Sequence, residues 1–104
     1  MKKLSESFNE ITVARGEKFQ IELKENPSSG YRWRFQVVSG KVSKVDDKFE
    51  RDEPRANVVG GLGTRRMTYN AYGGKDITIR ALYKRSWEKD SDAAGNLTLK
   101  VKIR

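Results

Sequence analysis

The sequence contains no cysteine and no histidine among its 104 residues. Without cysteine there is neither a disulfide framework nor a thiolate nucleophile. Without histidine the chain lacks the commonest general base and the commonest metal ligand of proteins. The acidic run Asp90-Ser91-Asp92 lacks the remaining ligands of a calcium loop. An enzyme is therefore the least favoured class, and we expect no catalytic residues, no metal and no cofactor.

Long apolar runs are also missing, and no stretch is long enough to span a membrane. The first seven residues hold two lysines, but the apolar segment of a signal peptide does not follow them. We expect no membrane partner, and either a cytosolic protein or a mature form whose signal has been removed. The length is that of one domain, so we expect a single domain over residues 1–104 that is monomeric when free.

Charge is plentiful, with 22 lysines and arginines against 14 acidic residues and a net charge of +8. Such a balance is typical of proteins that bind nucleic acid. Here, however, the basic residues recur along every segment and alternate with apolar positions, as on the solvent face of a sheet. A binder of single strands would need basic residues interleaved with exposed aromatics, and the runs Arg65-Arg66 and Lys84-Arg85 are too short to support this. We therefore expect no nucleic-acid partner.

Apolar residues alternate with polar ones at period two, which predicts strands with one buried face. No stretch of ten residues shows a helical stripe, and turn residues separate the runs. The pattern predicts an all-β fold, an antiparallel immunoglobulin-like sandwich of seven or eight strands. Shorter strands are expected at residues 11–14, residues 41–45, and Val58 with Val59, and a long mobile connection over residues 46–57. The expected inward positions are Phe19, Ile21, Leu23, Tyr31, Trp33, Phe35, Val37, Met67, Tyr69, Ala71, Ile77, Ile79, Ala81, Tyr83, Leu97, Leu99, Val101 and Ile103.

Three stretches differ from ordinary turns. We call the first, residues 26–31, the central turn. Its Asn-Pro pair starts a turn and its glycine accepts a positive φ. Taken alone, it is equally well read as a polar connection between strands. Its residues are Asn26, Pro27, Ser28, Ser29, Gly30 and Tyr31.

The second stretch, the glycine-rich segment, covers residues 60–64. Glycines carry an entropy cost and provide no packing, so they suit a backbone that must approach another surface closely. A phosphate cradle would need Lys-Ser or Lys-Thr and then a helix, whereas this segment leads into a strand. Its residues are Gly60, Gly61, Leu62, Gly63 and Thr64.

The third stretch, the Arg-Trp segment, consists of Arg85, Ser86 and Trp87. Trp87 follows the end of an alternating run. It is either packed over the end of the sandwich or exposed as an anchor of the type found at binding hot spots. Arg85 is either a second contact residue or a local brace against Glu88 or Asp90.

The order and spacing of the three stretches resemble the chagasin family of immunoglobulin-like inhibitors of papain-like cysteine peptidases. That family has an Asn-Pro-Thr-Thr-Gly loop, a Gly-x-Gly-Gly loop and an Arg-Pro-Trp loop, and the resemblance covers about residues 12–103. It implies reversible, tight occlusion of the protease cleft by all fourteen residues of the three stretches, which lie at one end of the sandwich. The central turn would lie over the catalytic cysteine and histidine, with the glycine-rich segment on the non-primed side and the Arg-Trp segment on the primed side. This sequence departs from the pattern at Ser28 and Ser29, where threonines are usual, at Leu62, where glycine is usual, and at Ser86, where proline is usual.

One other class stays open, a generic immunoglobulin-like adhesion or carbohydrate-binding module. A sugar-binding face of the common kind offers several exposed aromatics and paired acids. Of the aromatic residues, Trp87 and Tyr72 fall outside the expected core pattern.

Overall fold

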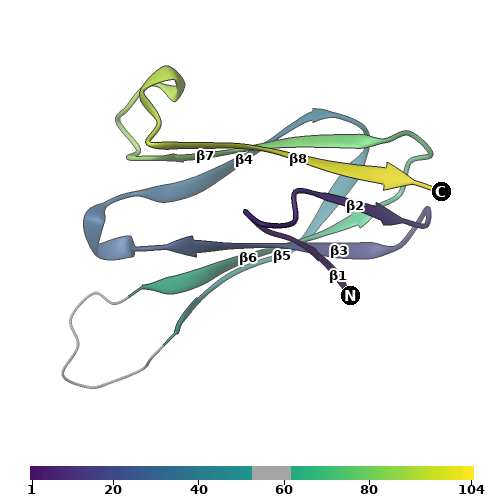
Figure 1. Ribbon diagram of the computed structural model, residues 1–104, viewed down its shortest axis with the longest axis horizontal. Coiled ribbons are helices and arrows are strands. Elements are labelled where there is room, and N and C mark those ends of the chain that lie inside the picture. Colours follow the sequence, from purple (N-terminus) through teal and green to yellow (C-terminus); the bar gives the residue numbers. More distant parts are fainter. Residues whose placement is uncertain (53–61) are drawn as a thin grey trace.

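The structure is a computed structural model that describes residues 1–52 and 62–104. Eight strands form two four-stranded sheets, which lie face to face as two layers in Figure 1. One sheet has the strand order β1-β3-β6-β5 and the other β2-β8-β7-β4. The strands are β1 (Lys2–Leu4), β2 (Glu10–Val13), β3 (Lys18–Glu25), β4 (Arg32–Ser39), β5 (Val42–Arg51), β6 (Gly63–Ala71), β7 (Ile77–Lys84) and β8 (Gly95–Ile103).

The predicted sandwich is therefore confirmed, with one difference at its edges. β1 pairs with β3 in parallel, and β2 pairs with β8 in parallel, whereas the other pairings are antiparallel. Within the described ranges the only helices are two short 3₁₀ turns, Pro27–Ser29 and Asp90–Asp92. No helix there is long and apolar enough to cross a membrane.

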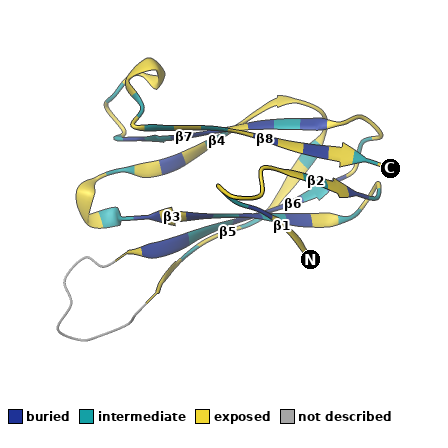
Figure 2. Ribbon diagram, in the orientation of Figure 1, coloured by how far each residue is buried: buried dark blue, intermediate teal, exposed yellow. Residues whose placement is uncertain are grey.

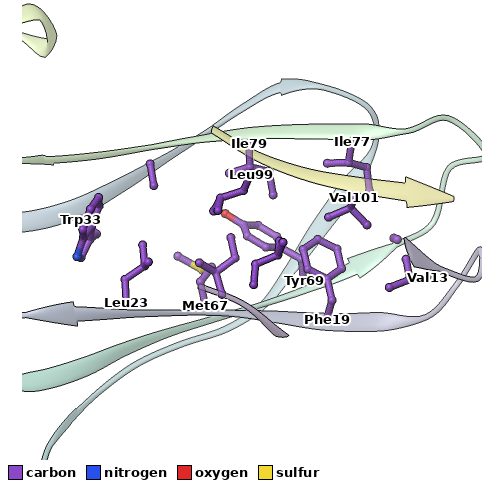
Figure 3. Close-up of a cluster of buried hydrophobic side chains, with 14 residues drawn as sticks. Val13, Phe19, Leu23, Trp33, Met67, Tyr69, Ile77, Ile79, Leu99 and Val101 are labelled. Atoms are coloured by element: carbon purple, nitrogen blue, oxygen red, sulfur yellow. The ribbon is translucent and has the colours of Figure 1, made fainter. Parts of the chain in front are cut away.

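The core lies between the two sheets and is built from the inward positions of the alternating strands, as Figures 2 and 3 show. Phe19 packs against Tyr69 from the neighbouring strand, with ring centroids 5.8 Å apart. Trp33, Leu23 and Met67 fill the end of the core nearer the central turn, and Ile77 and Val101 fill the other end. Most of the predicted inward residues are buried here, which confirms the period-two reading of the strands.

Four local features differ from the sequence-based expectations. Residues 46–51 belong to strand β5 instead of a mobile connection, while residues 53–57 lie outside the described residues, as do Val58 and Val59. The strand predicted at residues 41–45 thus continues to Arg51. This continuation was not predicted, because a register shift between Lys44 and Asp46 interrupts the alternation. β1 was not expected, since only its last residue is buried.

Val37 is exposed although the alternation placed it inward, because the strand becomes irregular between Val37 and Ser39. Leu82 is buried on the opposite side of its sheet from the core residue Ala81. The 3₁₀ turn Asp90–Asp92 packs on β7, and its Asp90 contacts Lys84 and Gln36 on the same face of the sheet as Leu82.

Candidate functional site

The three stretches identified in the sequence leave the sheets at the same end of the sandwich. The central turn joins β3 to β4, and the Arg-Trp segment follows the last residue of β7. In the register of the first sheet, Glu25 lies opposite Gly63 and pairs the start of β6 with the end of β3. Figure 1 shows the central turn, the end of β7 and the start of β6 on the left. Gly60 and Gly61 lie outside the described residues.

The central turn is a 3₁₀ turn held by its own side chains. The Asn26 side-chain oxygen accepts hydrogen bonds from the Ser28 N–H (3.2 Å) and the Ser28 hydroxyl (2.6 Å). The Ser29 hydroxyl donates to the Asn26 carbonyl (2.7 Å) and accepts from the Tyr31 N–H (3.2 Å). Gly30 closes the turn at φ 82°, a conformation that strongly favours glycine. Both serine hydroxyls, the groups retained where the family has threonine, therefore stabilise the turn from within.

The Arg-Trp segment lies against the central turn. The side chains of Arg85 and Trp87 both come within 3.9 Å of the position that a Cβ would occupy on Gly30. The Arg85 guanidinium lies 4.7 Å from the centre of the Tyr31 ring and 5.8 Å from that of Trp87, within the range of a cation–π contact. Trp87 itself is 75% exposed, so it is an exposed aromatic and is not packed into the core.

Aromatic rings connect the contact between Arg85 and Tyr31 to the core. Tyr31 stacks on Tyr83 at 5.3 Å, and Tyr83 packs on Trp33 at 4.8 Å. Together with Arg85 and Trp87 these three rings form a column, which we call the aromatic column. The Tyr83 hydroxyl also accepts a hydrogen bond from the Asn26 N–H (3.0 Å). The aromatic column thus ties the central turn and the Arg-Trp segment to the sandwich and to each other.

Hydrogen bonds around Glu88 complete the base of the Arg-Trp segment. Its carboxylate accepts from the Arg85 N–H (2.8 Å), and its carbonyl accepts from the Lys84 ammonium (2.7 Å). Lys84 also pairs with Asp90 (2.9 Å). The hydrogen bond from Lys84, aided by one from Gln36, lowers the pKa of the Asp90 carboxyl below its usual value. Glu88 therefore braces the Arg85 backbone, and the guanidinium of Arg85 stays on the aromatic rings.

In the glycine-rich segment Leu62 is exposed, whereas Gly63 and Thr64, which we call the base of the segment, are buried. Leu62 is 58% exposed, and its carbonyl accepts a hydrogen bond from the Asp52 N–H (3.2 Å). Gly63 is buried, and a Cβ there would overlap the ring of Phe49 and the carbonyl of Glu50. This glycine is therefore required by packing inside the chain, a reason that the sequence did not suggest.

Thr64 is buried too, and it anchors the same base. Its hydroxyl donates to Asp52 (2.9 Å), and Asp52 also pairs with Lys24 at the end of β3. The hydrogen bonds from Lys24 and Thr64 lower the pKa of the Asp52 carboxyl below its usual value. These contacts connect the glycine-rich segment to the strand that enters the central turn.

One buried charge lies directly beneath the site. Glu25, which is 1% exposed, accepts hydrogen bonds from the Trp33 N–H (2.9 Å) and from Arg65 (2.6 Å). Arg65 reaches Asp47 as well (3.0 Å). Since Glu25 and Trp33 flank the central turn, the carboxylate clamps the two ends of the turn together. Trp33 adds a bond from its indole N–H to the Lys24 carbonyl (2.7 Å).

Sequence reasoning did not single out Glu25, Arg65 or Tyr83 as supports of the site. A signal for the first two was present, because Glu25 continues the inward series Phe19, Ile21, Leu23 and Arg65 continues the series of Met67 in the opposite direction. A charged residue at an inward position demands a partner. The role of the Tyr83 hydroxyl had no comparable signal.

Comparison with known proteins identifies the family of the chain. The profile of the Chagasin family peptidase inhibitor I42 matches residues 12–101. The chain therefore belongs to the chagasin family of peptidase inhibitors, and the resemblance based on its three stretches is confirmed.

Its relatives include proteins from two organisms. The chain is 29% identical to Amoebiasin-2 of Entamoeba histolytica over 98 residues, covering 94% of this chain and 74% of the relative. It is 26% identical to Chagasin of Trypanosoma cruzi over 96 residues, covering 88% of this chain and 86% of the relative. The solved structure of the cysteine protease inhibitor EhICP2 from Entamoeba histolytica superposes with a TM-score of 0.84, at 27% identity, over 99% of this chain and 95% of that one.

Proposed function

We propose that this protein is a reversible, tight-binding inhibitor of papain-like cysteine proteases and occludes their active-site cleft with the three stretches at one end of the sandwich. The observation that carries the proposal is the contact between the central turn and the Arg-Trp segment through Gly30, Arg85 and Trp87. Membership of the chagasin family supports the same conclusion. The relatives are protease inhibitors rather than enzymes.

The central turn is the part suited to lie over the catalytic residues. Its donors and acceptors are largely used within the turn, and Pro27 fixes one φ angle. A turn that already holds one shape loses little entropy on binding. In this proposal the inhibitor needs no reactive group and is not cleaved.

The two flanking segments extend the contact surface on either side of the central turn. Trp87 supplies the large exposed ring on the primed side, and Leu62 supplies an exposed aliphatic side chain on the non-primed side. Gly63 and Thr64, being buried, position the base of their segment. Protease–inhibitor interfaces bury roughly 800 Å² on each partner, which one end of a domain of this size can provide.

We expect titration of active papain with the protein to abolish turnover at about one equivalent when the enzyme concentration lies well above the dissociation constant. Dilution should restore activity, and mass spectrometry should recover the inhibitor uncut. The comparison is a variant that carries Asn26→Gly and Pro27→Gly in the central turn and Trp87→Ala in the Arg-Trp segment, which should inhibit far less. Undiminished turnover of papain and of several other papain-like enzymes would refute the proposal.

Leu62 provides a more specific prediction. Burial of a leucine side chain stabilises by roughly 1.5–3 kcal/mol, and ordering the segment takes back part of this. Leu62→Gly should therefore weaken inhibition about tenfold against a protease whose non-primed subsite is apolar, with little change in the thermal midpoint of unfolding.

The control for Leu62 is Val38→Ala, because Val38 is equally exposed, at 58%, and lies near the other end of β4. It should inhibit like the parent protein. Tighter inhibition by Leu62→Gly would show that the leucine obstructs close approach instead of making a contact.

A further inference from the structure

The outer face of the sheet β2-β8-β7-β4 carries exposed cations that the inhibitor site does not use. Inward positions on these strands are filled by core residues such as Trp33, Ile79 and Leu99. The alternate positions point away from the core. Five of them are basic and exposed, and we call them the basic stripe: Arg32, Arg34, Arg80, Lys100 and Lys102.

The strand register places these five cations in a diagonal row. Arg34 lies opposite Leu82, and Arg80 lies opposite Gln36 on one side and Thr98 on the other. Lys100 lies opposite Thr78. Each cation is therefore displaced by two residues along the strands from the previous one, as the row crosses from β4 over β7 to β8. Neighbours along a strand are about 6.7 Å apart and diagonal neighbours about 7–8 Å, so the row is nearly 30 Å long.

The basic stripe lacks the acidic partners that the other sheet provides. Among the described residues, none of its five members lies within 4.0 Å of a carboxylate, whereas Lys3, Lys48 and Arg66 on the other sheet all do. Three acids lie nearby. Glu10 is opposite Lys100 in the register. Asp76 lines a surface pocket together with Lys100 and Lys102, and its carboxylate accepts a hydrogen bond from the Ile103 N–H. Asp90, near Arg34, is already bound by Lys84 and Gln36.

We propose that the basic stripe binds an extended sulfated polysaccharide. Regularly spaced cations on a flat face attract a linear polyanion and release its counterions. Between them lie the short hydroxyl side chains of Thr78 and Thr98, which can hydrogen-bond sugar hydroxyls.

Other polyanions fit this face less well. The described aromatics exposed most strongly are Phe8, Tyr72 and Trp87, and none belongs to β4, β7 or β8. The face therefore offers no platform for stacking the bases of a single strand. It also offers no helix or projecting ribbon to enter a duplex groove. The stripe begins at Arg32, next to the central turn, and runs away from the turn along the sheet. Its other four members therefore lie outside the inhibitor site.

The test uses heparin as the probe and compares two triple variants that each remove three positive charges. The stripe variant is Arg34→Gln, Arg80→Gln and Lys100→Gln. The control variant is Lys18→Gln, Lys41→Gln and Lys75→Gln, three exposed lysines outside this face. At about 0.1 M salt the stripe variant should bind heparin at least tenfold more weakly, and the control variant less than threefold. The slope of log K for heparin binding against log salt concentration should become less negative by about two to three in the stripe variant alone. This corresponds to nearly one unit of slope for each lost cation, as for phosphate contacts.

Both variants should keep their thermal midpoint and inhibit papain within twofold of the parent protein, because neither touches the inhibitor site. If the triple variant fails to fold, Arg80→Gln alone should weaken heparin binding about threefold. Equal losses in the two triple variants would show that net charge, not the stripe, drives binding. Absence of heparin binding, or tighter binding to duplex RNA or to anionic vesicles at the same salt, would also overturn the proposal.

Discussion

Trp87→Ala should weaken inhibition of papain by about 30-fold or more, which corresponds to about 2 kcal/mol of binding free energy. The ring is 75% exposed and contacts the rest of the protein through Arg85 and Gly30. A side chain with so few internal contacts contributes little to folding, so the thermal midpoint should stay within about two degrees of the parent value. Inhibition constants and thermal melts of the purified variant check both parts.

The control for Trp87 is Tyr72→Ala. Tyr72 is another exposed aromatic, at 50%, and it follows the end of β6 farthest from the site. It should inhibit like the parent protein. A large loss of stability in Trp87→Ala, with inhibition otherwise normal for the folded fraction, would show that Trp87 serves the fold.

Arg65→Met should lower the free energy of unfolding by about 3 kcal/mol or more. The substitution leaves the Glu25 carboxylate, 1% exposed, without its cationic partner, and breaking one side of a buried pair costs roughly 3–5 kcal/mol. Denaturant unfolding measures the loss. The matched control is Arg66→Met, because the neighbouring Arg66 is more exposed and pairs with Glu50 on the surface. Its loss should cost less than about 1 kcal/mol.

The double variant Glu25→Met with Arg65→Met separates the effect of the buried pair on folding stability from its effect on the position of the central turn. Replacing both charges with apolar groups should recover much of the unfolding free energy. It should not restore full inhibition, because the Trp33 N–H loses its acceptor and the two ends of the central turn lose their clamp. If Arg65→Met costs no more than Arg66→Met, or if the double variant inhibits like the parent, the buried pair does not position the site.

The period-two pattern predicted the sandwich because each strand that packs on the core repeats its apolar residue at every second position. Phe19, Ile21 and Leu23 show this most clearly, and all are buried. The pattern gave wrong predictions where buried residues do not alternate regularly with exposed ones along a strand. In β5 a register shift near Val45 disturbs the alternation. Leu82 is buried on the side of its sheet away from the core, where Asp90 of the following 3₁₀ turn contacts Lys84 and Gln36.

The candidate site was predictable to the extent that its residues have special backbone or surface properties. The positive φ of Gly30 and the exposure of Trp87 follow from residue type and position. The reason for Gly63 was not predictable, since it depends on the ring of Phe49 across a strand pair. The basic stripe was hidden for the same reason, because its members lie far apart in the sequence and are aligned only by the pairing of β4, β7 and β8.

The aromatic column limits how the chain length can vary in relatives of this protein. Tyr31 directly precedes β4, and its ring and that of Trp33 both contact Tyr83, the direct cross-strand partner of Trp33. One residue inserted between Tyr31 and Trp33 would turn Tyr31 to the opposite side of the strand, detaching the rest of the column from the core. Insertions and deletions should therefore be excluded from the stretch between these two rings, while substitutions at Pro27, Ser28 and Ser86 leave the column intact. We therefore expect relatives to adapt to other proteases by exchanging side chains at the tips of the central turn and the Arg-Trp segment, while the length of the stretch between the two rings stays the same.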